Sequence, residues 1–326
     1  YVMVLPAMGV VSEILPTFCR RTIFGYKFIA YSSILIAAIG SLVWAHHMFT
    51  SGMADVGRVV FSFLTFLVAV PSAVKVFNWL ATMYQGSILL DPPLLFALSF
   101  ILLFTIGGLT GLVLGAAATD VHVHDTYFVV GHFHFVMFGG TGMAFFAAMH
   151  YWLPKIYGRM YDKTVATVSW AVILIGFLIL YVSMKILGMQ GMPRRYYDYI
   201  PEFTGLNQLS TLGSWILAIG LILMFVNIFR GLFKGDPIGD NPWGGASLEW
   251  QVPSPPPHSS SRCTTRRCLR WSSVLVPPVT PRPTSPTCVC PSPVTCGPTC
   301  RSASGGATAC SSRSKRARRS RKPPTT

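Results

Sequence analysis

The sequence predicts an all-α polytopic membrane protein with about seven transmembrane helices, followed by a disordered tail. Of the 326 residues, 52% are hydrophobic and 11% are charged, whereas a soluble domain usually has about 25% charged residues. The apolar residues also form long segments, and a helix that spans a bilayer needs about 20 of them. Both observations favour a membrane-embedded helical bundle over a soluble protein.

Seven apolar segments are candidates for membrane spans. They cover residues 1–18, 26–50, 56–86, 92–118, 126–152, 164–189 and 207–233. The first is short and contains Pro6 and Pro16, so we expect it to be the remainder of a span that begins further upstream. The fourth contains Gly107, Gly111 and Gly115 at four-residue spacing, which indicates close packing against a neighbouring helix.

Lysine and arginine residues in the loops predict the orientation of the bundle, because they accumulate on the cytoplasmic or matrix side of a membrane. Eight of them lie in the loops after the first, fifth and seventh segments: Arg20, Arg21, Lys27, Lys155, Arg159, Lys163, Arg230 and Lys234. Four lie on the opposite side: Arg58, Lys185, Arg194 and Arg195. The loop that holds His122, His124 and Asp125 is therefore expected on the outer side.

The distribution of charge and cysteine divides the chain near residue 258. Up to residue 250 there are 13 Lys or Arg and 11 Asp or Glu, whereas the rest contains 13 Lys or Arg, no acid and seven of the eight cysteines. We therefore expect a transmembrane bundle over 1–240, a short extension over 241–258, and a basic disordered tail rich in Ser, Pro, Arg and Cys over 259–326. The cysteine spacings of the tail match no zinc-binding pattern.

Two hypotheses account for this tail. The first is that residues 259–326 are a frame-shifted translation of a GC-rich gene, and retranslation of the coding DNA in the other frames would test it. The alternative is a genuine disordered basic tail that binds anionic lipid or nucleic acid.

The segment "VHVHDTYFVVGHFHFVMFGG", residues 121–140, places four histidines and an aspartate close together. His132 and His134 are two residues apart, and on an α-helix such side chains point about 200° apart. They cannot both bind one small centre, but each can bind a separate large cofactor. Haem suits this arrangement, because histidine is a common axial ligand of haem iron. The alternative is a pair of core histidines bonded to neighbouring helices, but ionisable groups within a membrane are costly and usually functional.

A second candidate site is "WAHHMF", residues 44–49, near the outer end of the second segment. Adjacent side chains diverge by about 100° on an α-helix, so His46 and His47 could reach one metal only through different ring nitrogens or a distorted backbone. Ligation by imidazole alone suits copper, zinc or iron. The alternative is an interfacial pair that binds no metal.

Lys75 lies within the third segment, too deep for its side chain to reach the interface easily. A lysine whose charged form is disfavoured by burial suits proton relay, and Ser72 lies one turn before it. The alternative is a structural ion pair. Because the second to fifth segments contain no acid, its partner would come from the first segment, the seventh or elsewhere.

A further candidate site is the pair Arg194 and Arg195 in "MPRRYYDY", residues 192–199. The pair lies on the outer side, against the general distribution of positive charge. Arginine binds carboxylates in forked geometry, and two buried haems would present four propionates near that surface. The alternative is a solvated pair or one that binds lipid headgroups.

Together these residues resemble subunit I of the haem–copper terminal oxidases, specifically cytochrome c oxidase of the aa3 type. Five motifs carry the resemblance: "WAHHMFTSGM" (44–53), "VPSAVKVFNWLATMY" (70–84), "FTIGGLTGLVLG" (104–115), "VHDTYFVVGHFHFVMFGG" (123–140) and "GMPRRYYDY" (191–199). They occur in the order and spacing of the family and cover about residues 1–257. The family's fold has twelve spans, and the resemblance is to the last six and most of the one before.

The resemblance implies roles for four histidines. His132 would be the proximal ligand of the high-spin haem, where oxygen binds. His134 would be one axial ligand of the low-spin haem. His46 and His47 would be two of the three ligands of the copper beside the high-spin haem. Both haems are expected to be of the a type.

The resemblance also implies roles for residues of the outer side. His124 and Asp125 match a Mg²⁺ or Mn²⁺ site near the interface with subunit II. Arg194 and Arg195 match the pair that binds the haem propionates. His122 matches no family role, and we expect it to be a surface residue.

Ser72, Lys75 and Thr110 match a proton pathway that leads from the inner side to the metal pair. Tyr1 matches the active-site tyrosine, which in the family is cross-linked to the first copper ligand. The implied activity is reduction of O₂ to water with electrons from cytochrome c, coupled to proton translocation. The expected partners are oxidase subunits II and III and the lipid bilayer, with no nucleic acid. The expected location is a bacterial plasma membrane or a mitochondrial inner membrane, with the bacterial one favoured.

The sequence departs from the family at its N-terminal side. The motif His-Pro-Glu-Val-Tyr is cut at its tyrosine, so the first copper ligand and the second axial ligand of the low-spin haem are not found in this sequence. We therefore expect this polypeptide alone to be inactive. The alternatives are a quinol oxidase of the same superfamily, which the Mg²⁺-site residue Asp125 disfavours, a related nitric oxide reductase, which Lys75 and Tyr1 disfavour, a haem-holding module without turnover, and a non-functional product of a broken gene.

Overall fold

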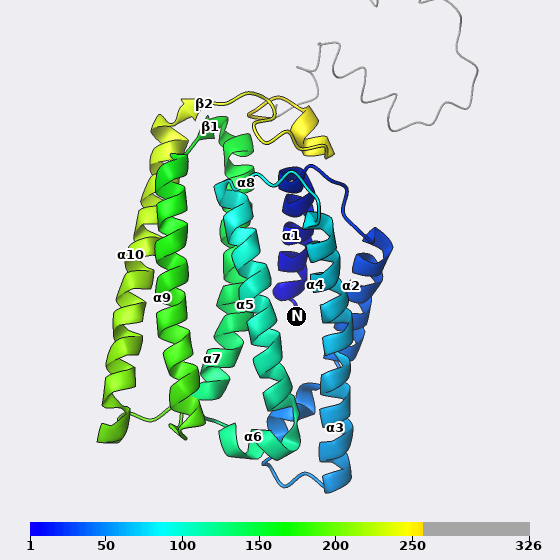
Figure 1. Ribbon diagram of the computed structural model, residues 1–326, viewed down its shortest axis with the longest axis vertical. Coiled ribbons are helices and arrows are strands. Elements are labelled where there is room, and N and C mark those ends of the chain that lie inside the picture. Colours follow the sequence, from blue (N-terminus) through cyan, green and yellow to red (C-terminus); the bar gives the residue numbers. More distant parts are fainter. Residues whose placement is uncertain (257–326) are drawn as a thin grey trace, which may run out of the picture. The chain divides into compact units, whose positions relative to one another are not determined.

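The computed structural model describes residues 1–256, so the predicted tail at 259–326 and the last two residues of the predicted extension lie outside it. Within the described residues, long helices stand side by side and short connections join them at both ends (Figure 1). The bundle comprises α1 (Val4–Cys19), α2 (Tyr26–Gly40), η1 (Trp44–Met48), α3 (Asp55–Leu67), α4 (Ala69–Met83), α5 (Pro92–Gly115), α7 (Tyr127–Val136), η2 (Met137–Gly142), α8 (Met143–Tyr157), α9 (Lys163–Met189) and α10 (Thr204–Lys234). The connecting elements are α6 (Ala117–Val123), β1 (Arg159–Met160), η3 (Pro201–Phe203), β2 (Asp236–Pro237) and η4 (Leu248–Gln251).

Six segments of the described chain are long and apolar enough to cross a bilayer. They are Tyr26–Met48, Asp55–Met83, Pro92–Gly115, Tyr127–Tyr157, Lys163–Met189 and Pro201–Lys234. They coincide with the second to seventh predicted segments and confirm the predicted membrane bundle. The first predicted segment is α1, whose 16 residues extend about 24 Å, short of the roughly 30 Å hydrocarbon core of a bilayer.

Three of these segments break or change helix type along their length, and the sequence explains two of the changes. Pro71 has no backbone N–H to donate to residue 67, and α3 ends at Leu67 while α4 begins at Ala69. In the fourth segment, η2 is a π-helical turn of sequence "MFGGTG". A Cβ on Gly139 would lie 2.8 Å from Leu103 Cβ, so glycine allows this wider turn to pack directly on α5. The third change is the 3₁₀ turn η1.

Helix α7 lies between α5 and α9 and contacts both. Phe135 is fully buried and meets Phe177 of α9 at 5.0 Å between ring centroids. On the α5 side, a Cβ on Gly107 would lie 3.0 Å from Val136. A histidine on α7 therefore faces one neighbouring helix or the other, according to its position around the helix.

The segment after α10 packs on one end of the bundle, where β1 and β2 pair (Figure 1). Trp243 and Trp250 are 3% and 1% exposed, and the indole N–H of Trp243 donates to the carbonyl of Tyr151 at 3.0 Å. Lys155 donates to the carbonyls of Asp240 and Val252. These contacts join the segment to α8, so its described residues form part of the same packed unit as the helices.

Candidate metal centre

His132 and His134 point toward different neighbours of α7, as helix geometry predicts. The imidazole of His132 faces α5, where its Nδ1 lies 3.0 Å from the carbonyl oxygen of Gly107 and 3.1 Å from Oγ1 of Thr110. The imidazole of His134 stacks on Tyr181 of α9, with 4.4 Å between ring centroids and 19° between planes. Two cofactors bound at these histidines would lie on different sides of one helix.

The hydrogen bonds of both rings define which nitrogen is free to bind a metal. A carbonyl oxygen only accepts, so Nδ1 of His132 carries the proton it donates to Gly107. Nδ1 of His134 likewise donates to the carbonyl of Val130 at 2.8 Å. Nε2 of each ring therefore keeps its lone pair, which is the tautomer and anchoring that metal-binding histidines commonly show. The residues present fit an axial ligand at each position.

His150 shows that this hydrogen-bond pattern alone does not define a ligand. Like His134, it donates from Nδ1 to the carbonyl four residues earlier, at 2.7 Å from the oxygen of Phe146. However, it is fully buried between Phe96 and Tyr161 at ring distances of 4.9 and 4.8 Å. Its surroundings are filled by other rings, so we interpret it as a core residue.

His46 and His47 lie on the 3₁₀ turn η1, where adjacent side chains diverge by about 120°, so both can bind one metal only through differently oriented ring nitrogens. Their ring centroids are 4.4 Å apart with 67° between planes. The hydroxyl of Thr65 donates to the carbonyl of Phe61 and accepts from Nδ1 of His46 at 3.0 Å. Nε2 of His46 is thereby left as the metal-binding nitrogen.

The structure brings His46 toward His132, because Thr65, which bonds His46, meets Gly115 one turn along α5 from Gly111, which meets His132. Within the described chain, no group of three or more His, Cys, Asp or Glu side chains is arranged to hold a metal ion. The pair therefore fits two ligands of a metal whose coordination another group would complete.

A cluster of charged residues lies beyond the outer end of α5, and sequence analysis missed its buried member, Asp120. This carboxylate is 4% exposed and accepts from Nδ1 of His124 at 3.0 Å. Burial raises the pKa of Asp120, while His124 and His47 oppose the shift. The spacing of four residues between Asp120 and His124 on a helix was the available signal for this pair.

Arg194 binds Asp125, so the structure joins two groups that the sequence suggested have separate roles. Nε and Nη2 of Arg194 lie 2.8 and 2.7 Å from the same carboxylate oxygen. The hydrogen bond from Arg194 is the main reason that the pKa of Asp125 is lowered. The carboxylate of Asp125 also lies 3.8 Å from Nε2 of His124, and Arg195 is more distant at 4.0 Å. The guanidinium group of Arg195 is largely exposed.

The predicted proton-pathway residues do not form one hydrogen-bonded chain within the described residues. Lys75 is 2% exposed and donates to the hydroxyl of Ser33 on α2 at 2.7 Å. Ser72 donates to the carbonyl of Val68 in its own helix at 3.0 Å. Thr110 contacts His132 instead, so it belongs to the histidine site in this structure.

Tyr1 packs against α2. A Cβ on Gly40 would lie only 2.6 Å from Cε2 of the Tyr1 ring, so the ring packs directly on the backbone of Gly40. Half of the surface of Tyr1 is exposed. The N-terminal end lies midway along the height of the bundle (Figure 1). The structure thus places Tyr1 within the depth of the helices. Its neighbour Gly40 lies six residues before His46 on the same segment.

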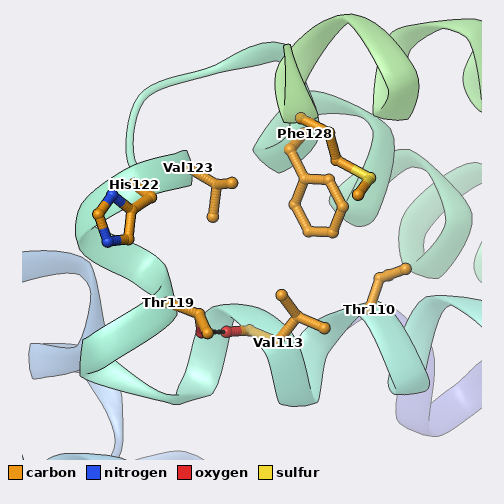
Figure 2. Close-up of a pocket in the computed structure, with 7 residues that line it drawn as sticks. Thr110, Val113, Thr119, His122, Val123 and Phe128 are labelled. Carbon is orange, nitrogen blue, oxygen red and sulfur yellow. Dashed lines mark hydrogen bonds between the residues drawn. The ribbon is translucent and has the colours of Figure 1, made fainter. Parts of the chain in front are cut away.

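An apolar cavity of about 430 Å³ lies beside Thr110. Figure 2 shows Val113, Val123 and Phe128 around it, with His122 at its edge. His122 is exposed, as expected for a surface residue. The cavity adjoins the α5 face to which His132 points.

These features define a class of protein: a helical membrane bundle that carries imidazoles, each anchored through Nδ1, on two sides of one helix. The chain matches the family described as "Cytochrome C and Quinol oxidase polypeptide I" over residues 1–216, and it belongs to that family.

Individual relatives agree with this assignment. The chain is 46% identical over 256 residues to cytochrome c oxidase subunit 1 of Synechocystis sp., which covers 78% of this chain and 46% of that protein. It is 41% identical over 261 residues to the corresponding subunit of Bacillus subtilis, which covers 79% of this chain and 42% of that protein. The chain thus spans less than half the length of these curated relatives.

A solved structure of a haem–copper terminal oxidase dimer has the same fold. It superposes with a TM-score of 0.66 over 72% of this chain and 47% of that chain. The sequence identity is 24%, so this similarity concerns the fold alone.

Proposed function

We propose that this chain contributes to the catalytic subunit of a cytochrome c oxidase, which reduces O₂ to water and couples the reaction to proton translocation. The observation that carries the proposal is the arrangement of His132 and His134 on α7. Each ring is anchored through Nδ1 and keeps Nε2 for a metal, and the two face different helices. Family membership supports the same function, because relatives of the chain are named cytochrome c oxidase subunit 1.

His132 would hold the high-spin haem and His134 the low-spin haem, both of the a type. His46 and His47 would supply two ligands to copper, and Tyr1 would lie near that centre. When bound, haem iron and copper would supply the electrons and the binding site for O₂. The third copper ligand and the second axial ligand at His134 would come from residues outside the described helices, and this polypeptide alone is expected to be inactive.

The protein's own contribution at this centre is to orient the ligands. Gly107 and Thr110 hold the ring of His132 through Nδ1, and Thr65 does the same for His46. A hydrogen bond to the far nitrogen also makes a bound imidazole more electron-donating. These contacts reduce the freedom of the rings before any metal is bound.

On the outer side, Asp125 and His124 would bind Mg²⁺ or Mn²⁺, and Arg194 and Arg195 would bind haem propionates. Arg194 and Asp125 form an ion pair. This ion pair would link the proposed metal site at Asp125 to the proposed propionate site at Arg194. Protons would reach the centre through Lys75 and Ser72, with Thr110 beside His132.

The proposed partners are subunits II and III, with cytochrome c as the electron donor, in a bacterial plasma membrane. The six membrane-length helices and the bacterial relatives support this location. Quinol is the alternative donor, since the family description includes quinol oxidases. Oxidation of cytochrome c against oxidation of a quinol by the purified complex would separate the two.

Haem content per complex tests the assignment of the two histidines. In the complete oxidase that contains this chain, His132→Ala and His134→Ala should each lose one haem of two, with different changes in the reduced-minus-oxidised spectrum. His122→Asn is the matched control, because His122 is exposed, and it should keep both haems. Retention of both haems in either α7 variant would overturn the assignment, and a complex that binds no haem at all would favour a non-functional gene product.

A further inference from the structure

A cavity with charged residues on its wall lies between Lys75 and one end of the bundle. It has a volume of about 730 Å³ and is lined by residues of α1, α2, α4 and the segment after α10. Lys75 and Ser33 lie on its wall, while Arg20 and Arg21 lie on its wall in the loop after α1. That loop belongs to the side of the bundle where positive charge predominates, which is the expected inner side.

Glu13 lines the same cavity as Lys75. It is the only acidic residue before Asp55 in the sequence, and it is half-buried within the membrane-embedded helix α1. A carboxylate at this depth is costly unless it has a functional or electrostatic partner. If Lys75 has an acidic partner, the sequence places it outside the second to fifth segments, and in the structure Glu13 of the first segment lines the same cavity.

The helices around this cavity are fixed by polar contacts on both sides of Glu13 and Lys75. Ser12, next to Glu13, accepts from the indole N–H of Trp79 on α4 at 2.9 Å. Lys75 donates to Ser33 on α2 at 2.7 Å, and Ser33 donates in turn to the carbonyl of Ile29. The ammonium group has three N–H bonds, so it can make two further hydrogen bonds.

Water can connect the two groups. A cavity needs a volume of roughly 15 Å³ to hold one water molecule, and the water needs polar groups as partners. The cavity here is far larger, and its wall carries carboxylate, ammonium and hydroxyl groups. The other charged or titratable side chains on its wall are Arg20, Arg21 and Tyr26. The guanidinium groups of Arg20 and Arg21 donate to the carbonyls of Gly244 and Tyr84.

We propose that Glu13 is the proton donor to Lys75 in the oxidase, a role that rests on the proposed function. In each transfer the O–H bond of the protonated Glu13 breaks, and the proton passes through water to the neutral amine of Lys75, where an N–H bond forms. The resulting carboxylate takes up a proton from the aqueous phase beside Arg20 and Arg21. Lys75 then passes its proton toward the metal centre and returns to the neutral amine. These steps transfer protons only, and no group is oxidised or reduced.

Proton uptake during reduction of the metal centre tests this role in the complete oxidase. A pH-indicating dye reports uptake after rapid mixing with reductant, while the haem spectra report electron arrival. General acid–base groups contribute typically 10²-fold or more, so Glu13→Gln should slow proton uptake by roughly that factor and increase its solvent deuterium isotope effect. Glu13→Asp keeps the carboxyl group and should recover much of the rate.

The comparison with Lys75→Met separates the possible results. If Lys75→Met is slow and Glu13→Gln is as fast as the unmodified oxidase, Glu13 is no donor although the pathway through Lys75 holds. If Glu13→Gln and Glu13→Asp are equally slow with unchanged isotope effects, the residue acts through packing and the proposal is overturned. If Lys75→Met also has no effect, the proposed pathway itself is wrong. Unchanged haem spectra in every variant show that the fold is kept.

Discussion

Replacement of Gly111 by alanine tests how tightly the protein positions the ring of His132. A Cβ at residue 111 would lie 2.9 Å from Cε1 of His132. Ordinary contacts begin at 3.4 Å, so the ring would have to move by about 0.5 Å or the helices would have to separate. Gly108 is the matched control, because a Cβ there would meet nothing within 4 Å.

The magnitude follows from the contacts that hold the ring. Its hydrogen bond to Gly107 is 3.0 Å long and its contact with Thr110 is 3.1 Å. A shift of about 0.5 Å weakens both, and the net loss of a hydrogen bond costs about 1 kcal/mol. That energy corresponds to a roughly fivefold weaker hold on the haem. Alanine is also favoured over glycine in a helix by about 1 kcal/mol, so Gly108→Ala should leave stability unchanged or increase it.

The assay is titration of the reduced oxidase with carbon monoxide, which binds an open haem iron, together with the iron–histidine stretching frequency of that haem. Gly111→Ala should lower the amount of competent high-spin haem and shift the stretching frequency, whereas Gly108→Ala should change neither. The reasoning is refuted if both variants give the same spectrum as the unmodified oxidase, or if both lose haem equally.

Three further changes have effects that the structure predicts. Thr65→Val removes the acceptor that orients His46, and loss of such a contact typically weakens metal binding by about tenfold or more, which copper analysis per haem would measure. Trp243→Ala removes an indole that is 3% exposed, so the complex should lose about 3 kcal/mol of stability and release haem at a lower temperature. Asp125→Asn removes the ion pair with Arg194. Because the pKa of Asp125 is lowered from 3.8 in the folded protein, its contribution to stability is present above 3.8 and lost as pH falls through the lower folded value. The carboxylate is 53% exposed, so the difference at neutral pH should be roughly 0.5 kcal/mol and should disappear in acid.

Each of these predictions has a contrary outcome. Thr105→Val is the control for Thr65→Val, since the hydroxyl of Thr105 bonds only the carbonyl of Ile101 in its own helix, and equal copper loss in the two variants would contradict a specific role. An unchanged thermal transition in Trp243→Ala would mean that the segment after α10 does not stabilise the bundle. If the stability lost in Asp125→Asn instead grew as the pH falls, the ion pair with Arg194 would not be the source of the stability that Asp125 contributes.

The spans and the opposed histidines could be predicted because they depend on local periodicity. The length of an apolar segment fixes whether it can cross a bilayer, and the angle between His132 and His134 depends only on helix geometry. Both properties are encoded within a few turns of one helix. The structure therefore identifies the neighbours of these residues, while the directions of their side chains are those expected from helix geometry.

Contacts between distant segments could not be predicted in the same way. Nothing near His46 in sequence indicates that Thr65, 19 residues later, accepts from its ring. The pairing of Asp125 with Arg194 joins residues that are 69 positions apart, and each was assigned a different partner from sequence alone. Lys75 likewise donates to Ser33 rather than to Ser72, although Ser72 is one turn away on the same helix.

The three spaced glycines of α5 show why a regular pattern can combine unlike roles. At Gly107 the close neighbours are Val136 and Phe135, and at Gly115 the neighbour is Thr65, so both permit helix packing. At Gly111 the neighbour is the imidazole of His132. The four-residue spacing brings all three to related sides of α5, but only the middle one faces a proposed haem ligand. The same absence of a side chain that lets two helices approach also leaves room for the ring that binds the metal, and the pattern alone does not separate these two uses.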